Sequence, residues 1–201
     1  MNIFLRAHRA STSAAGLALA VLLVATLSGL QVPTLNLLGG GKSYVPVGVL
    51  LPLVGVSALM SFLTNVPAEV EATAVRPVQR YEAIAVSLAV VLSLAVGALL
   101  GFIGLQEHAF AATRNLTGYM GLAVLGHRFL GRHAAVVIPL IFAFACMTAG
   151  RRAGGHPWPW AWPMFESRHI PATLVALALY LVGLVFLLSK ARPMRRAKDG
   201  P

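Results

Sequence analysis

The sequence predicts an all-α, multi-pass membrane protein with six transmembrane helices, and three observations support this prediction. Of its 201 residues, 58% are hydrophobic and only 11% are charged. A soluble domain of this length has too little interior to bury so many apolar side chains. The apolar residues fall into runs long enough to cross a bilayer, and the basic residues lie mostly between those runs. We therefore expect a single transmembrane domain over residues 1–201, located in the plasma membrane.

The chain is strongly basic, with 16 lysines and arginines, 6 acidic residues and a net charge of +10. Taken alone, this balance would suggest a nucleic-acid partner. Since the basic residues border apolar runs, we assign them to membrane topology and to contacts with lipid headgroups. We therefore expect no nucleic-acid partner. The single cysteine, Cys146, lies inside an apolar run, where a small core residue is the expected role.

Five apolar runs are clear spans of about 17 to 23 residues, the length that a bilayer core requires. They are residues 11–31, 44–64, 82–104, 134–150 and 170–190. The first begins like a secretory signal peptide, but further spans follow it, and we interpret it as a retained helix. Pro52 lies within the second span, where its missing N–H predicts a kink. Gly97 and Gly101 form a GxxxG pattern in the third, which favours close helix packing inside the subunit.

A sixth span is less obvious, because RNLTGYMGLAVLGHRFLGRH (114–133) offers about twelve apolar or small residues between Arg114 and His127. Those residues make about 18 Å of helix, whereas a bilayer core is about 30 Å thick. A helix that begins at Ala109 gains the missing length and gives a span over 109–126. Its glycines at 118, 121 and 126 predict close packing, so we expect this helix to be the interior one.

The distribution of basic residues supports this sixth crossing. With six spans, eleven basic residues share one side of the membrane and five share the other. The larger group is Arg6, Arg9, Arg76, Arg80, Arg128, Arg132, Lys190, Arg192, Arg195, Arg196 and Lys198. The smaller group is Lys42, Arg114, Arg151, Arg152 and Arg168. Without the sixth crossing the excess disappears, so the positive-inside rule predicts six spans with both termini cytoplasmic.

The sequence lacks the usual motifs of catalysis. Its acidic residues all lie in loops or at the ends of spans, which argues against a proton-coupled carrier. There is no GxSxG, HExxH or GxxxxGK[ST] pattern, so any ATP hydrolysis must come from another chain. We predict no catalytic residue, no metal site and no cofactor. His108, His156 and His169 could bind a metal only if their loops fold together, and we regard this as the weaker alternative.

The loop over residues 65–83 is the only segment with many charges of both signs, and we expect it on the cytoplasmic face. Its charged residues are Glu69, Glu71, Arg76, Arg80 and Glu82. Residues 68–75 can form a short helix along the membrane that ends before Pro77. Such a helix suits docking to a soluble partner; a solvated connector with its arginines at the headgroups is the equal alternative.

The loop over residues 155–169, on the predicted outer face, is rich in aromatic residues separated by prolines. They are Trp158, Trp160, Trp162 and Phe165. Amphipathic rings anchor at the membrane interface, and we favour this role over contact with a substrate. The prolines exclude an ordinary helix, and a shallow re-entrant or interfacial segment fits the pattern.

Arg114 is the one charge that we place within a span, about five residues from its start. Two roles are open to it. Its side chain can extend to the outer interface, which we favour. It can instead face the bundle and meet an anionic group such as Glu107.

These features together resemble the membrane subunit of an ABC-2-type exporter. That family has six helices, cytoplasmic termini, a coupling helix between helices two and three, and a re-entrant hairpin before helix six. The segments EATAVRPVQRYEA, TRNLTGYMGLAVLGHR and WAWPMF also resemble small membrane proteins of high-GC actinobacteria that accompany ABC transport genes. The short N-terminus differs from the long entry helix usual in the family, which leaves room for an accessory subunit.

The resemblance implies that the chain is the membrane-spanning subunit of an ATP-driven exporter, either the permease itself or an accessory subunit. A separate ATPase would dock on the 65–83 loop, centred on Glu71, Arg76 and Arg80, and a second membrane subunit, alike or different, would complete the path. One alternative is a membrane anchor or scaffold that transports nothing. A weaker alternative is a membrane enzyme that acts on a lipid-linked substrate through Glu107, His108 and Arg114.

Overall fold

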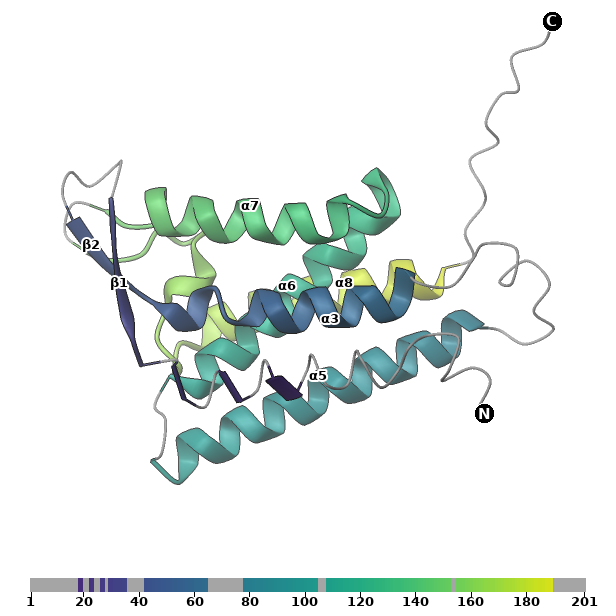
Figure 1. The fold of residues 1–201 in the computed structure, drawn as a ribbon, viewed down its shortest axis with the longest axis horizontal. Coiled ribbons are helices and arrows are strands. Elements are labelled where there is room, and N and C mark those ends of the chain that lie inside the picture. The colour runs from purple at the N-terminus through teal and green to yellow at the C-terminus, as the bar shows by residue number, and fades with distance from the viewer. Residues whose placement is uncertain are drawn as a thin grey trace, which may run out of the picture.

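The computed structural model describes residues 18–19, 22–23, 26–27, 29–35, 42–64, 78–104, 108–152 and 155–189. Within them the chain is mainly helical. The helices are α3 (Pro52–Thr64), α5 (Val78–Phe102), α6 (Ala109–Leu130), α7 (Ala134–Ala149) and α8 (Ile170–Leu188). They run along the long axis of the molecule, and each helix from α5 to α8 reverses the direction of the one before it (Figure 1).

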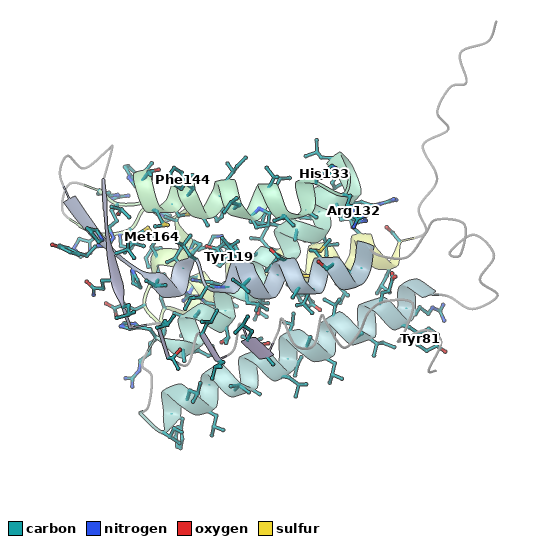
Figure 2. All side chains as sticks on the ribbon, in the orientation of Figure 1. Tyr81, Tyr119, Arg132, His133, Phe144 and Met164 are labelled. Carbon is teal, nitrogen blue, oxygen red and sulfur yellow. The ribbon has the colours of Figure 1, made fainter. Side chains whose placement is uncertain are left out.

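A small antiparallel hairpin lies at one end of the helical bundle, which we call the hairpin end (Figure 1). Its strands are β1 (Gln31–Leu35) and β2 (Lys42–Pro46), with Gln31 opposite Pro46 and Leu35 opposite Lys42. The segment between α7 and α8 lies at the same end and includes the short 3-10 helix η2 (Trp162–Met164). Figure 2 shows Met164 there, Tyr119 inside the bundle, and Arg132 and His133 at the opposite end.

The predicted second span, residues 44–64, is not one helix. The strand β2 ends at Pro46, the 3-10 helix η1 (Val47–Val49) follows, and α3 begins at Pro52. Pro52 is therefore the first residue of a helix, and the predicted mid-span kink is wrong. A proline at the first helical position loses no hydrogen bond, because an N–H there has no partner within the helix.

The helix α6 is the interior helix of the bundle, as the sequence predicted. It begins at Ala109, the expected residue, and ends at Leu130, four residues beyond the predicted end. It contacts α3, α5, α7 and α8, and its contact with α8 is the most extensive in the described fold. Every residue from 112 to 121 is buried.

Glycines make this packing possible, because a side chain would not fit where the helices meet. A Cβ atom added at Gly121 would collide with the backbone of Leu179 and Tyr180 on α8. One added at Gly118 would collide with the Trp162 indole, and one at Gly97 of α5 with the Thr113 side chain. Gly97 therefore packs inside the chain, as expected from the GxxxG pattern.

The outward faces of α5, α7 and α8 are apolar. On α5 the exposed side chains include Ile84, Leu88 and Leu99, which are 58–64% exposed. Two segments of the described chain, Arg80–Phe102 and Ile170–Leu188, are long and apolar enough to cross a membrane, whereas Val47–Ser61 and Ala134–Ala149 are apolar but shorter. The helix α6 is long enough, but polar side chains lower its hydropathy. The first predicted span, residues 11–31, lies largely outside the described residues.

Candidate functional site

Arg114 is the centre of the most polar region inside the bundle. Its side chain is 1% exposed, although it lies one and a half turns into α6. Its Nη1 donates to the Glu166 carbonyl at 3.0 Å, and its Nη2 donates to the carbonyls of Phe165 at 2.9 Å and Trp162 at 3.4 Å. The planar fork of an arginine can serve several acceptors at once. The Arg114 guanidinium therefore holds the end of η2 against α6.

Asn115, the next residue on α6, extends this contact. Its Nδ2 donates to the Pro163 carbonyl at 2.9 Å, and its Oδ1 accepts from Nε and Nη2 of Arg114 at 3.4 Å. Asn115 is also 1% exposed. We call Arg114 and Asn115 with the four carbonyls of residues 162, 163, 165 and 166 the carbonyl clamp. It supplies side-chain donors to the carbonyls of Pro163 and Phe165, and it adds donors to the carbonyls of Trp162 and Glu166, which also accept from backbone N–H groups of the same segment.

An aromatic contact lies beside the clamp. The Trp162 indole is 3% exposed and rests on Gly118. Its ring centroid is 5.5 Å from that of Tyr119 and 5.9 Å from that of Phe142 on α7, the latter in a stacked arrangement. Trp162 therefore fills the space between α6 and α7 at the hairpin end.

These positions differ from two sequence expectations. Arg114 does not extend to an outer interface, because its guanidinium N–H groups donate to backbone carbonyls inside the bundle. Trp162 is not an interfacial anchor, because it is enclosed by α6 and α7. Trp160 is 42% exposed, while Trp158 and Phe165 are half-buried. Glu107, the anionic partner considered for Arg114, lies outside the described residues.

The chain leaves α7 through a tight turn that carries two arginines. The Trp158 N–H donates to the Gly150 carbonyl at 2.8 Å, and the Arg152 N–H donates to the His156 carbonyl at 3.0 Å. The Arg152 guanidinium lies 4.1 Å from the Trp158 ring centroid, a cation–π contact. Arg151 is half-buried, and this burial lowers the pKa of its guanidinium, which nevertheless stays charged at neutral pH.

His169 ends the segment and starts α8. Its Nδ1 accepts from the Ala172 N–H at 3.2 Å, so it acts as the N-cap of the helix. Its ring stacks on Phe165 with centroids 4.0 Å apart. Since Nδ1 is an acceptor, the proton of the neutral ring is on Nε2.

A cavity of about 680 Å³, which we call the basic pocket, opens at the hairpin end. Asn115 of α6 forms part of its floor, and η1 and the segment after α7 form its walls. Its charged and titratable lining residues are Arg151, Arg168, Glu166, His108, His156 and His169. The three histidines, which the sequence places in two separate loops, therefore line one cavity.

This gathering does not make a metal centre. Within the described ranges, no group of three or more His, Cys, Asp and Glu side chains is arranged to hold a metal ion. His169 also uses Nδ1 to cap α8. What the pocket offers instead is a set of cationic and N–H donor groups, which suits an anion.

The predicted docking loop is described only in part. Glu69, Glu71 and Arg76 lie outside the described residues. Arg80 and Glu82 belong to the first turns of α5, where Arg80 is exposed and Glu82 is buried, 7% exposed. Of these two residues, only Arg80 offers its side chain to a partner.

The chain matches no protein-family model, no curated protein and no solved structure. Its function must therefore be inferred from the chemistry of the clamp and the pocket. Arg114 was recognisable from the sequence as a charge within a span, whereas the role of Asn115 was not. The adjacent pair Arg114–Asn115 inside a predicted span was the available signal, because two neighbouring polar residues there require internal partners.

Proposed function

We propose that the chain is a multi-pass protein of the plasma membrane in which residues 11–31 and the helices α3, α5, α6, α7 and α8 cross the bilayer. The supporting observation is an inversion of polarity: Arg114 and Asn115 are buried, while large apolar side chains on α5, α7 and α8 are exposed. Soluble monomers rarely expose apolar patches of this extent. In lipid the inversion is favourable, because apolar side chains meet acyl chains and polar groups find partners inside.

Both termini are cytoplasmic in this proposal, and the hairpin end faces outward. The single cysteine, Cys146, is fully buried, so an introduced cysteine is the only thiol open to a reagent. We expect a membrane-impermeant maleimide to label His156→Cys on intact cells and to label Ser189→Cys only after permeabilisation. Both positions are exposed at opposite ends of the bundle. The reverse pattern would refute the orientation, and equal labelling on intact cells would refute the bilayer between them.

Within that membrane placement, we propose the function of a membrane subunit of an ATP-driven exporter. The observation that carries it is the segment Arg151–His169, which turns into the bundle and buries Trp162 against α6. A re-entrant element at this position, before the last helix, is what the resemblance to ABC-2-type exporters implies. The carbonyl clamp explains how such an element can be held, since backbone at membrane depth requires protein partners.

The membrane-enzyme alternative, the weaker one, is less well supported at Arg114. The Arg114 guanidinium already donates to three backbone carbonyls and to Asn115, so it has little capacity left for a substrate. The scaffold alternative differs from the exporter only in whether ATP hydrolysis and export accompany it. The experiment below separates the two.

The exporter proposal is tested by purifying the tagged chain from its native cells and identifying bound proteins by mass spectrometry. We expect an ATPase subunit with a Walker A motif, and ATP hydrolysis by the purified complex. Charge reversal at Glu71, Arg76 and Arg80 should remove that subunit. The control is His133→Glu, an exposed change in the turn between α6 and α7. Retention of the ATPase in the triple variant would refute the docking surface, and its absence from the wild-type complex would favour the scaffold.

A further inference from the structure

A second, larger cavity of about 1220 Å³ adjoins the basic pocket. Three residues line both cavities: His108, Glu166 and Arg168. The second cavity lies between the end of α5 and the start of α8, with Phe110 of α6 also in its wall. We call it the apolar groove. The pocket and the groove therefore lie on either side of these three shared residues.

The two cavities differ in chemistry. Among the described residues, the basic pocket has two arginines against one glutamate, with three histidines and the Asn115 amide beside them. Away from the three shared residues, the groove is lined mainly by apolar residues such as Phe102, Ile170 and Leu174, with Ser167 and Thr173 beside them. Phe102, Ile170 and Leu174 are 90%, 71% and 60% exposed, so they pack little against the rest of the chain.

Arg168 lies at the junction of the pocket and the groove. It is exposed, and within the described parts of the chain its guanidinium forms no hydrogen bond or ion pair. Arg114, by contrast, is fully engaged in the carbonyl clamp. Arg168 therefore carries a charge at the polar end of an apolar groove and has donors available for an anion.

We propose that the pocket and the groove together bind an anionic amphiphile, with a phosphate-bearing head in the basic pocket and an acyl chain in the apolar groove. The pocket volume falls within the range of about 300–1,000 Å³ that is usual for small-molecule sites. The arginine fork matches the geometry of a phosphate, and the groove matches a chain that would otherwise meet water. The inference rests on the proposed membrane placement, in which the groove opens to the outer leaflet, and it names the substrate class of that site.

Tryptophan fluorescence gives a direct test, because the three tryptophans of the chain, Trp158, Trp160 and Trp162, all lie in the segment that walls the pocket. The full chain, purified in dodecyl maltoside, is titrated with monododecyl phosphate. Two comparison probes carry one half of the ligand each: inorganic phosphate has the anionic head alone, and dodecylphosphocholine has the chain with a zwitterionic head. We expect saturable binding of monododecyl phosphate, at least tenfold tighter than either comparison probe.

Two variants test the two halves of the site separately, and both change exposed side chains, so the fold is retained. Arg168→Gln should weaken monododecyl phosphate binding about tenfold, since it removes a charged donor. Phe102→Ala should weaken it roughly threefold to tenfold by removing apolar contact with the chain. The control is Arg132→Gln, an exposed arginine at the opposite end of the bundle, which should bind as the wild type does.

Three results would overturn the inference. Equal affinity for inorganic phosphate would show that the groove contributes nothing. Equal affinity for dodecylphosphocholine would show that the anionic charge is not recognised. An unchanged affinity in Arg168→Gln and Phe102→Ala would place binding elsewhere. The assay contains no ATPase, so a negative binding result does not bear on the exporter proposal. Conversely, the binding result holds even if no ATPase is found with the chain.

Discussion

The helices α6 and α8 form the most extensive helix–helix contact of the described bundle, yet their surfaces are opposite in character. On α6 the residues from 112 to 121 are all buried, and they include Thr113, Arg114, Asn115 and Thr117. On α8 only Ala172, Ala176, Tyr180 and Gly183 are buried, while Leu174, Leu181 and Val185 are 56–65% exposed. In this chain the polar helix is the inner one and the apolar helix is the outer one.

The comparison shows that hydropathy follows the exposure of these two helices and not their importance to the fold. The inner helix can carry polar groups because its neighbours supply partners, in particular the carbonyls of residues 162–166. The outer helix needs apolar side chains because it has no such partners. Substitutions on the two helices should therefore have very different effects on the free energy of unfolding.

The largest effect is expected at Arg114. Arg114→Leu removes every side-chain donor of the carbonyl clamp except the Asn115 amide, and it takes from the Phe165 carbonyl the donor at 2.9 Å. We expect a loss of about 3–5 kcal/mol in the free energy of unfolding. Arg114→Lys, which keeps the charge without the fork, should be intermediate. Unfolding in mixed detergent micelles, followed by tryptophan fluorescence, measures the difference.

Arg168→Gln is the matched control for this arginine, because Arg168 is exposed. It should change the free energy of unfolding by less than about 0.5 kcal/mol. If Arg114→Leu were as stable as this control, the carbonyl clamp would not stabilise the fold.

The second largest effect is expected where α6 and α8 meet. Gly121→Ala places a methyl group against the backbone of Leu179 and Tyr180, and backbone cannot move aside as a flexible side chain can. We expect a cost of about 1–3 kcal/mol, typical of an overpacked interior. The same unfolding measurement tests it, and a neutral result would mean that the helices are farther apart than described.

A smaller effect is expected at Tyr180, whose hydroxyl forms a hydrogen bond of 2.8 Å with Ser87 Oγ on α5. Tyr180→Phe should cost about 0.5–1.5 kcal/mol. Tyr119→Phe is the matched comparison, since the Tyr119 hydroxyl is buried and has no hydrogen-bond partner in the part of the chain that the structure describes. Removal of that hydroxyl should be neutral or stabilising. Equal costs for the two changes would contradict the assignment of the α5–α8 hydrogen bond.

The smallest effect is expected on the outer face of α8. Val185 is 65% exposed, so Val185→Ala removes methyl groups that pack little against the described chain. A change below about 0.5 kcal/mol is expected in the same assay. A cost as large as that of Gly121→Ala would indicate that a further subunit or segment covers this face.

Much of the arrangement of the helices follows from the sequence. The run that starts at Ala109 is too polar to stand alone in lipid, and its glycines allow close contact, so its interior position was predictable. The α3 region was misassigned, because residues 44–51 are as apolar as a helix, whereas residues 44–46 pair with β1 and a 3-10 helix follows them. Short apolar runs of this kind fit a strand or a helix equally well.

The sequence by itself determined the apolar outer faces, the interior position of α6 and the presence of a charge that needed a partner. Only the tertiary structure decided what that partner is. The acceptors of Arg114 are backbone carbonyls 48–52 residues away, and every residue type carries the same carbonyl, so no sequence pattern marks them. The basic pocket follows from the same cause, because its histidines and arginines meet only after the clamp has folded the segment after α7 onto α6.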